Sequence, residues 1–167
     1  MLVNPDEYRT ISPAGDKMKI CAFLWVYYGY PNSNYEGVNV EVMRYRNGAI
    51  MARDEAATGG VPELDYVAGV PDSGVPSALG YAFESGIPYA DGIVKNRYVG
   101  RTFIEPTQAM RQLGIRLKLN PLRSVIEGQR LVVIDDSIVR GNTSKKLVQM
   151  LRDAGAAEVH LRIVSPE

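Results

Sequence analysis

The residues best suited to chemistry lie in one stretch, Leu131 to Ser144, which reads LVVIDDSIVRGNTS. Four apolar residues lead directly into two adjacent carboxylates, Asp135 and Asp136. A short continuous apolar run is typical of a strand that is covered on both faces, so we expect the carboxylates where a buried strand ends. Carboxylates suit sugar hydroxyl groups or a metal-bridged diphosphate. The stretch therefore predicts a binding loop for an oxygen-rich ligand.

The residues after the acidic pair predict a phosphate cradle. Gly141 allows the main chain to approach a ligand closely, and we expect Thr143 or Ser144 to cap a helix over Lys145–Ala154. Such a helix start offers unpaired N–H groups and the positive end of the helix dipole, and Ser137 adds a hydroxyl. The spacing is not the GxxxxGK[ST] of a nucleoside-triphosphate loop. A phosphorylated ribose would fit both parts of the stretch, because its hydroxyl groups suit the carboxylates and its phosphate suits the cradle.

The same order of strand, small-residue turn and helix occurs earlier in the chain. We expect a strand over Tyr66–Val70, a turn at Pro71-Asp72-Ser73-Gly74 and a helix over Val75–Ser85. The other expected elements are strands at Ile20–Tyr28, Tyr89–Val94 and Glu158–Val164, a helix at Val40–Ala57 with Val42, Tyr45, Ala49 or Ile50 and Ala56 on its apolar face, and a mobile loop, a helix and a short strand within Asn96–Arg123. Alternating strands and helices predict an α/β fold with an open, mostly parallel sheet and right-handed crossovers. Ligands of such sheets bind beyond the carboxyl ends of the strands, where both turns are expected.

Composition limits the classes of function. The 167 residues are 46% hydrophobic, which is enough for one domain with a core, and 19 basic residues balance 19 acidic ones. This balance gives no indication of nucleic acid or of a membrane surface as partner, and the first residues lack a signal-peptide pattern, so we expect a cytoplasmic protein. The single histidine, His160, lies in an alternating strand pattern that favours a structural role. The single cysteine, Cys21, is expected to be a buried strand residue.

Four motifs carry a resemblance to a known family. The stretch VVIDDSIVRGNTS resembles the phosphoribosyl pyrophosphate (PRPP) signature of the type I phosphoribosyltransferases. With VPDSGVPSALGYAFESGIPY, VKNRYVGRTFI and RLKLNPLR, the chain resembles the amidophosphoribosyltransferase branch, which begins purine biosynthesis. The resemblance implies the type I phosphoribosyltransferase fold, an open twisted sheet with helices on both faces. It also implies transfer of the phosphoribosyl group of PRPP to ammonia, with release of pyrophosphate.

The resemblance assigns roles to residues of this chain. Asp135 and Asp136 would meet the ribose hydroxyls, directly or through Mg²⁺. The residues implied to bind PRPP are Asp72, Ser73, Gly74, Asp135, Asp136, Ser137, Ile138, Val139, Arg140, Gly141, Asn142, Thr143 and Ser144. The residues implied to act in catalysis, from a loop that closes over PRPP, are Lys95, Arg97, Tyr98 and Arg101. Each motif also has an alternative interpretation without a ligand. The acidic pair would be solvated carboxylates, the loop after it an ordinary helix cap, the turn at Asp72–Gly74 a β-turn before a helix, and the basic loop a solvated face.

The resemblance also implies partners outside this chain. Ammonia comes from an N-terminal glutaminase domain, so residues 1–19 are interpreted as a lead-in or interdomain connection, and residues 20–167 as the transferase core without the family's C-terminal helices. A homo-oligomer is expected. Cys21 falls where some members place one ligand of an iron–sulfur cluster, but one thiolate cannot hold a cluster. The chain departs from the family at Leu24, Tyr30, Asn32 and Asn142. Two other functions remain open: a non-catalytic regulatory module that binds PRPP or a nucleotide, and an inert fragment.

Overall fold

The computed structural model describes residues 15–59, 63–97 and 118–165, together with residues 2, 3, 5, 7–9 and 13. Its centre is a parallel sheet of three strands in the order β5, β8, β9. β5 spans Tyr66–Gly69, β8 spans Arg130–Asp135 and β9 spans Glu158–Ile163. Ala68 pairs with Val133, which in turn pairs with Leu161. The strands predicted near these three positions are therefore confirmed.

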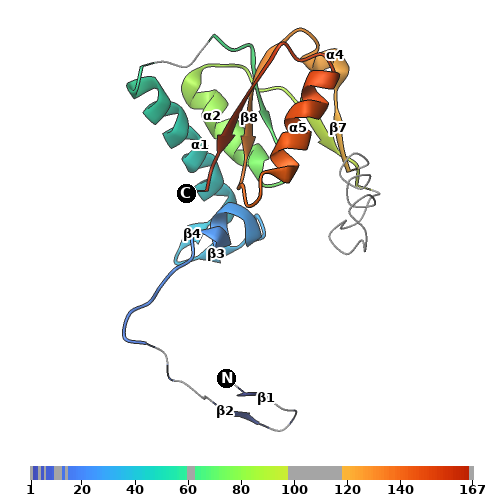
Figure 1. The fold of residues 1–167 in the computed structure, drawn as a ribbon. Coiled ribbons are helices and arrows are strands. Elements are labelled where there is room, and N and C mark those ends of the chain that lie inside the picture. Colours follow the sequence, from blue (N-terminus) through green and yellow to red (C-terminus); the bar gives the residue numbers. More distant parts are fainter. Residues whose placement is uncertain are drawn as a thin grey trace.

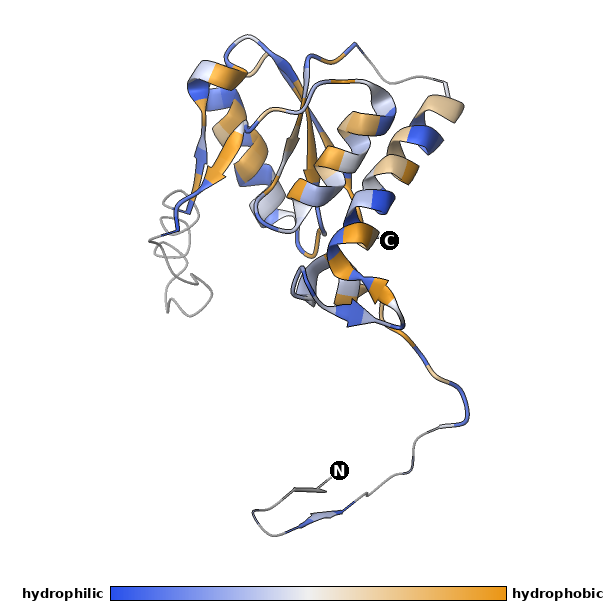
Figure 2. Cartoon of the chain, turned by 180° about the vertical axis from the view of Figure 1, so that it is seen from behind, coloured by the Kyte–Doolittle hydropathy of each residue, from blue (hydrophilic) through white to orange (hydrophobic). Residues whose placement is uncertain are grey.

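Helices cover both faces of the central strand β8, which lies between them in Figure 1. Val132 and Ile134 face α1 (Val40–Ala57) and α2 (Gly74–Ser85), whereas Leu131 and Val133 face α4 (Arg123–Ile126) and α5 (Asn142–Asp153). Each of these four strand side chains is at most 1% exposed, and burying one contributes about 1.5–3 kcal/mol. Figure 2 shows hydrophobic strands enclosed between helices that mix hydrophobic and hydrophilic residues. The predicted fold class is confirmed.

Helices α1 and α2 pack so closely that two glycines are required between them. A Cβ on Gly48 would lie 1.8 Å from the carbonyl oxygen of Ser77, and one on Gly80 would lie 1.9 Å from that of Tyr45. The buried residues of α1 are Val40, Arg44, Gly48 and Ala52, at a spacing of four. The predicted apolar face is therefore wrong, because Val42, Tyr45 and Ile50 are 36–49% exposed. The buried side of α1 is therefore determined by the close approach of the α1 and α2 backbones and not by the size of the side chains.

A separate antiparallel pair flanks the main sheet. β6 (Ile93–Lys95) pairs with β7 (Leu119–Pro121), so that Lys95 lies opposite Leu119. Tyr89 makes a single parallel bridge to Val67, so only the end of the predicted strand Tyr89–Val94 belongs to a regular strand. Of the long region predicted as loop, helix and strand, residues 98–117 lie outside the described residues. The short strand predicted at its end is present as β7.

The segment predicted as a first strand, Ile20–Tyr28, is not a strand. Leu24–Tyr28 form a single π-helical turn, η1, which packs on α1. The guanidinium of Arg44 donates hydrogen bonds to the carbonyl oxygens of Trp25 (2.8 Å), Tyr27 (3.2 Å) and Gly29 (3.0 Å). These bonds satisfy carbonyl groups that a strand would have paired with a neighbour. Because the segment is not in a sheet, the expectation of a buried Cys21 is also wrong, and its side chain is exposed.

Two short hairpins complete the description. β3 (Asn34–Tyr35) pairs with β4 (Val38–Asn39) next to η1, and β1 (Leu2–Val3) pairs with β2 (Tyr8–Arg9) in the lead-in, which lies apart from the core in Figure 1. His160 in β9 contacts Glu158 at 3.0 Å, and its expected structural role stays a prediction. Within the described ranges, no helix is both long and apolar enough to cross a membrane.

Candidate active site

Two loops meet at the carboxyl edge of the sheet. The turn after β5 approaches the end of β8 because the N–H of Val70 donates to the carbonyl oxygen of Ile134 at 2.9 Å. At Gly74, the first residue of α2, a Cβ would lie 2.4 Å from the same carbonyl oxygen. The peptide bond between Pro71 and Asp72 is cis. Only a residue without a side chain allows α2 to begin this close to the acidic pair.

The acidic pair is buried. Asp135 is 8% exposed and Asp136 is 9% exposed, so they are not solvated loop carboxylates. The main-chain oxygens of both residues accept hydrogen bonds from the segment after β9, Asp135 from Val164 (3.0 Å) and Asp136 from Ser165 (2.9 Å). Burial, together with the charge of Asp136, raises the pKa of Asp135 to about 6. Two carboxylates held this closely with little solvent favour a cation or several hydroxyl donors as ligand.

Hydroxyl groups from both loops converge on Asp136. Ser73 Oγ donates to Asp136 Oδ2, and Ser137 Oγ donates to Asp136 Oδ1 at 2.6 Å. The N–H of Asp136 donates to Asp135 Oδ1 at 2.9 Å. The structure thus joins four of the residues predicted for the ligand site, and they come from two separate strand ends.

The loop after the acidic pair leads to the start of α5. Gly141 takes a left-handed φ of 69° and is the N-cap residue, so the prediction that Thr143 or Ser144 caps the helix is wrong. No side chain caps this end in the part of the chain that the structure describes. The first N–H groups of α5 therefore remain available for a ligand. Ser144 is buried, whereas Ile138 and Val139 are 48% and 86% exposed, so the side chains of these two residues lie in solvent.

Of the four residues predicted for catalysis, the structure describes two. Lys95 ends β6, and its Nζ forms an ion pair with the carboxylate of Asp72 in the turn after β5. Arg97 is exposed, two residues further along. Tyr98 and Arg101 lie outside the described residues. The pairing of β6 with β7 brings the end of the RLKLN motif to the same region, because the N–H of Asn96 donates to the carbonyl oxygen of Lys118 at 2.7 Å.

Arg44 is the residue near this site that the sequence analysis missed. It is 4% exposed, and burial lowers its pKa, while the charges of Glu41 and Asp136 act in the opposite direction. Its guanidinium therefore interacts electrostatically with Asp136 and at the same time holds η1 through three carbonyl oxygens. The i, i+4 spacing of Val40, Arg44 and Gly48 is the sequence pattern that indicates that Arg44 lies on the buried side of α1.

The donor set at the acidic pair fits a magnesium ion shared with a substrate. Mg²⁺ is usually bound by one or two carboxylates together with water and substrate oxygens. Asp135 and Asp136 supply two carboxylates, and within the described residues no group of three or more acidic, histidine or cysteine side chains could form a cage without substrate. The residues therefore suit a metal that arrives with a diphosphate or a sugar.

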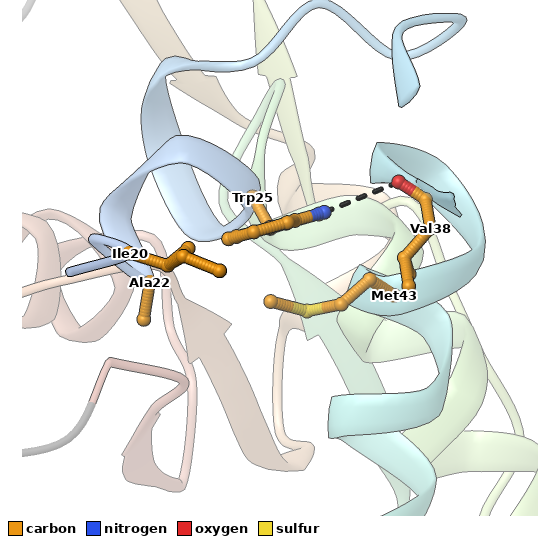
Figure 3. A pocket seen from close by; sticks show the side chains of 5 residues that line it. All are labelled: Ile20, Ala22, Trp25, Val38 and Met43. Carbon is orange, nitrogen blue, oxygen red and sulfur yellow. Dashed lines mark hydrogen bonds between the residues drawn. The ribbon is translucent and has the colours of Figure 1, made fainter. Parts of the chain in front are cut away.

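A hollow of about 320 Å³ lies near η1 and is lined by Ile20, Ala22, Trp25, Val38 and Met43. Figure 3 shows the indole Nε1 of Trp25 donating to the carbonyl oxygen of Val38 at 3.2 Å, while the other side chains shown are apolar. This lining has no charged group for a phosphate. The hollow therefore differs in chemistry from the site at the acidic pair.

A buried acidic pair and a helix start meet at the carboxyl edge of a parallel sheet, in an α/β fold with helices on both faces of the sheet. Residues 55–164 match the model of the phosphoribosyl transferase domain, and the chain belongs to that family.

Within the family, the amidophosphoribosyltransferases are similar over nearly the whole chain. That of Synechococcus elongatus is 55% identical over 148 residues, which is 89% of this chain and 29% of the relative. That of Mycobacterium tuberculosis is 52% identical over 166 residues, covering 99% and 31%. The structure of the Bacillus subtilis glutamine PRPP amidotransferase, complexed with ADP and GMP, superposes with a TM-score of 0.74 at 51% identity, covering 87% of this chain and 31% of that one. The chain thus spans about a third of the length of these relatives.

Proposed function

We propose that this chain is the phosphoribosyltransferase part of an amidophosphoribosyltransferase. It binds PRPP with Mg²⁺ and transfers the phosphoribosyl group to ammonia, which gives phosphoribosylamine and pyrophosphate. The observation that carries the proposal is the meeting of two loops at Asp136, where hydroxyls from the turn after β5 and from the loop after β8 bind one buried carboxylate. Similarity to amidophosphoribosyltransferases over 99% of the chain supports the choice of reaction.

The loop after β8 binds the ribose and its 5′-phosphate, and the turn after β5 binds the diphosphate. Asp135 and Asp136 accept hydrogen bonds from the ribose hydroxyls, and the N–H groups at the start of α5 bind the 5′-phosphate with the hydroxyls of Thr143 and Ser144. The main chain of Ser73 and Gly74 faces the diphosphate. In the proposed arrangement the anomeric carbon of the ribose lies between the β8 loop and the β5 turn, and its bond to pyrophosphate breaks there.

Leaving-group stabilisation is the main catalytic task, because positive charge develops on the ribose while negative charge grows on the diphosphate. Lys95, at the end of β6, contacts the turn that receives the diphosphate and supplies a cationic side chain, and Arg97 adds a second one two residues further along. Asp135 and Asp136 would hold Mg²⁺, directly or through water, and the ion would supply positive charge to the same leaving group. The buried acidic pair also stabilises the developing charge on the ribose from the opposite side.

The partners follow from the same proposal. Ammonia is supplied by the glutaminase domain of the full-length enzyme, which works as a homo-oligomer in the cytoplasm. We assign residues 1–19 to the connection between the domains and residues 20–167 to the transferase core. A non-catalytic regulatory module is not favoured, since the relatives that cover nearly the whole chain bear the name of the enzyme.

The test is release of pyrophosphate by the purified chain when Mg²⁺, PRPP and an ammonium salt are supplied together. We expect release that depends on ammonium and does not occur with glutamine as the only nitrogen source. Binding of PRPP without any release would instead support the regulatory module. The matched control is Asp153→Asn, which removes an exposed carboxylate at the far end of α5 and should leave the rate unchanged.

A further inference from the structure

The turn proposed to receive a diphosphate carries a negative side chain. Asp72 follows the end of β5 and is 75% exposed, so its carboxylate lies at the mouth of the site rather than in the core. A carboxylate in this position repels a diphosphate, and the N–H groups of the turn do not remove that repulsion. The presence of Asp72 therefore requires a reason other than direct binding of the ligand.

The partner of Asp72 supplies that reason. The Nζ atom of Lys95 forms an ion pair with Asp72 Oδ2, and the lysine side chain is 30% exposed. Lys95 is the last residue of β6, whereas Asp72 belongs to the turn between β5 and α2, so the pair joins the antiparallel hairpin to the main sheet. Lys95 also supplies one of the cations of the proposed chemistry, and it contacts the turn directly. In the free protein, this cation is therefore already held by a carboxylate of the protein.

A diphosphate and Asp72 must compete for the same ammonium group. A lysine ammonium is a compact charge on a flexible stem, so Lys95 can move from Asp72 to an incoming phosphate without displacing the main chain. Each time a diphosphate leaves, the carboxylate recovers the lysine. The competition lowers the affinity for the free diphosphate, which is the product of the proposed reaction.

We propose that Asp72 is a positioning residue that competes with pyrophosphate for Lys95 and thereby promotes product release. This inference rests on the proposed function, because it takes the turn after β5 as the diphosphate site. It makes an uncommon prediction for a site variant: removal of the Asp72 charge tightens the binding of a ligand, whereas damage to the loop would weaken it.

The experiment is calorimetric titration of pyrophosphate, with Mg²⁺ in excess, into the wild-type chain and into Asp72→Asn, Lys95→Met and the double variant. Exposed ion pairs contribute about 0.2–1 kcal/mol, so we expect Asp72→Asn to bind pyrophosphate about two- to fivefold more tightly. In the Lys95→Met background the same change should give a smaller gain, because there it relieves only the direct repulsion between Asp72 and pyrophosphate. Asp72→Glu keeps the carboxylate and should bind pyrophosphate within about twofold of wild type.

Three outcomes would overturn the inference. Equal or weaker binding by Asp72→Asn shows that the carboxylate does not compete with the ligand. An equal gain in the Lys95→Met background shows simple repulsion that does not act through the lysine. A wild-type chain that is folded but binds neither PRPP nor pyrophosphate contradicts the proposed function itself, and is distinguished from the other two outcomes by the missing wild-type signal.

Discussion

Ser73 Oγ donates a hydrogen bond to Asp136 Oδ2, and this bond connects two loops that are 63 residues apart in the sequence. Ser73 precedes α2, whereas Asp136 follows β8. Ser137 donates to the other carboxylate oxygen of Asp136, so both oxygens are oriented before any ligand arrives. The site is therefore pre-organised by hydroxyl groups from the turn after β5 and from the loop after β8, and each contribution can be removed separately.

Ser73→Ala removes the hydroxyl contributed by the turn after β5. A hydrogen bond to a charged group contributes about 1.5–3 kcal/mol to the stability of the folded chain, so we expect the unfolding free energy to fall. The affinity for PRPP with Mg²⁺ should fall as well, because Asp136 Oδ2 is no longer oriented before the ligand arrives. Titration calorimetry and urea unfolding measure the two quantities. Ser85→Ala, at the other end of α2, is the control, and equal affinities for the two variants would contradict the role of Ser73.

Asp135→Asn should stabilise the chain at pH 8. Burial and the charge of Asp136 raise the pKa of Asp135 to about 6, above its ordinary 3.8. An acid whose folded-state pKa is raised gives its full stabilisation at pH values below its ordinary pKa and loses it as the pH rises through 6. The loss corresponds to about 3 kcal/mol. Urea unfolding should therefore show a gain for Asp135→Asn at pH 8 that shrinks towards pH 4, whereas the same gain at both values would exclude titration of Asp135 as its cause.

Gly74→Ala should impair both folding and the site. The added Cβ would lie 2.4 Å from the carbonyl oxygen of Ile134, so α2 must move away from the end of β8. Overpacking of this kind costs about 1–3 kcal/mol, and we expect PRPP binding to weaken as the turn separates from the acidic pair. Gly15→Ala is the control, since a Cβ at that position meets no atom within 4 Å. Unfolding and binding equal to those of the control would show that the close approach at Gly74 is not required.

Arg44→Met should detach η1 from α1. The carbonyl oxygens of Trp25, Tyr27 and Gly29 lose their donor, and each buried group left without a hydrogen bond costs about 1–3 kcal/mol. Trp25 is the single tryptophan of the chain, so its fluorescence reports directly on this contact. We expect a red shift together with a lower unfolding midpoint in urea. Arg46→Met, at an exposed position of α1, should keep the wild-type spectrum, and an unshifted spectrum in Arg44→Met would contradict the assignment.

The sequence predicted the parts of the fold in which local pattern and tertiary position agree. The apolar run of β8 is covered on both faces, and the carboxylates that follow it lie at the sheet edge as expected. The turn after β5 was predicted for the same reason. The amidophosphoribosyltransferase resemblance is consistent with the relatives, whereas the roles of individual site residues remain predictions.

The sequence failed where distant residues decide the local structure. The run Ile20–Tyr28 is apolar enough for a strand, but its second half forms a π-helical turn because Arg44, 17 to 19 residues away, binds the carbonyl oxygens of Trp25 and Tyr27. Apolar runs of this length do not distinguish a strand from a buried helix. The predicted cap of α5 was wrong because Gly141 adopts a left-handed φ and is itself the N-cap residue. The helix therefore begins at Asn142, before the predicted start at Lys145.

The central claim is that Asp136 belongs to a PRPP site, and calorimetric titration of PRPP with Mg²⁺ tests it most directly. The wild-type chain and the control Asp153→Asn should bind PRPP with equal affinity. Asp136→Asn should bind at least about tenfold more weakly, because the neutral amide loses charge-assisted bonds to the ribose hydroxyls and the metal. Affinity equal to wild type in a folded Asp136→Asn chain would remove the acidic pair from the site and contradict the account.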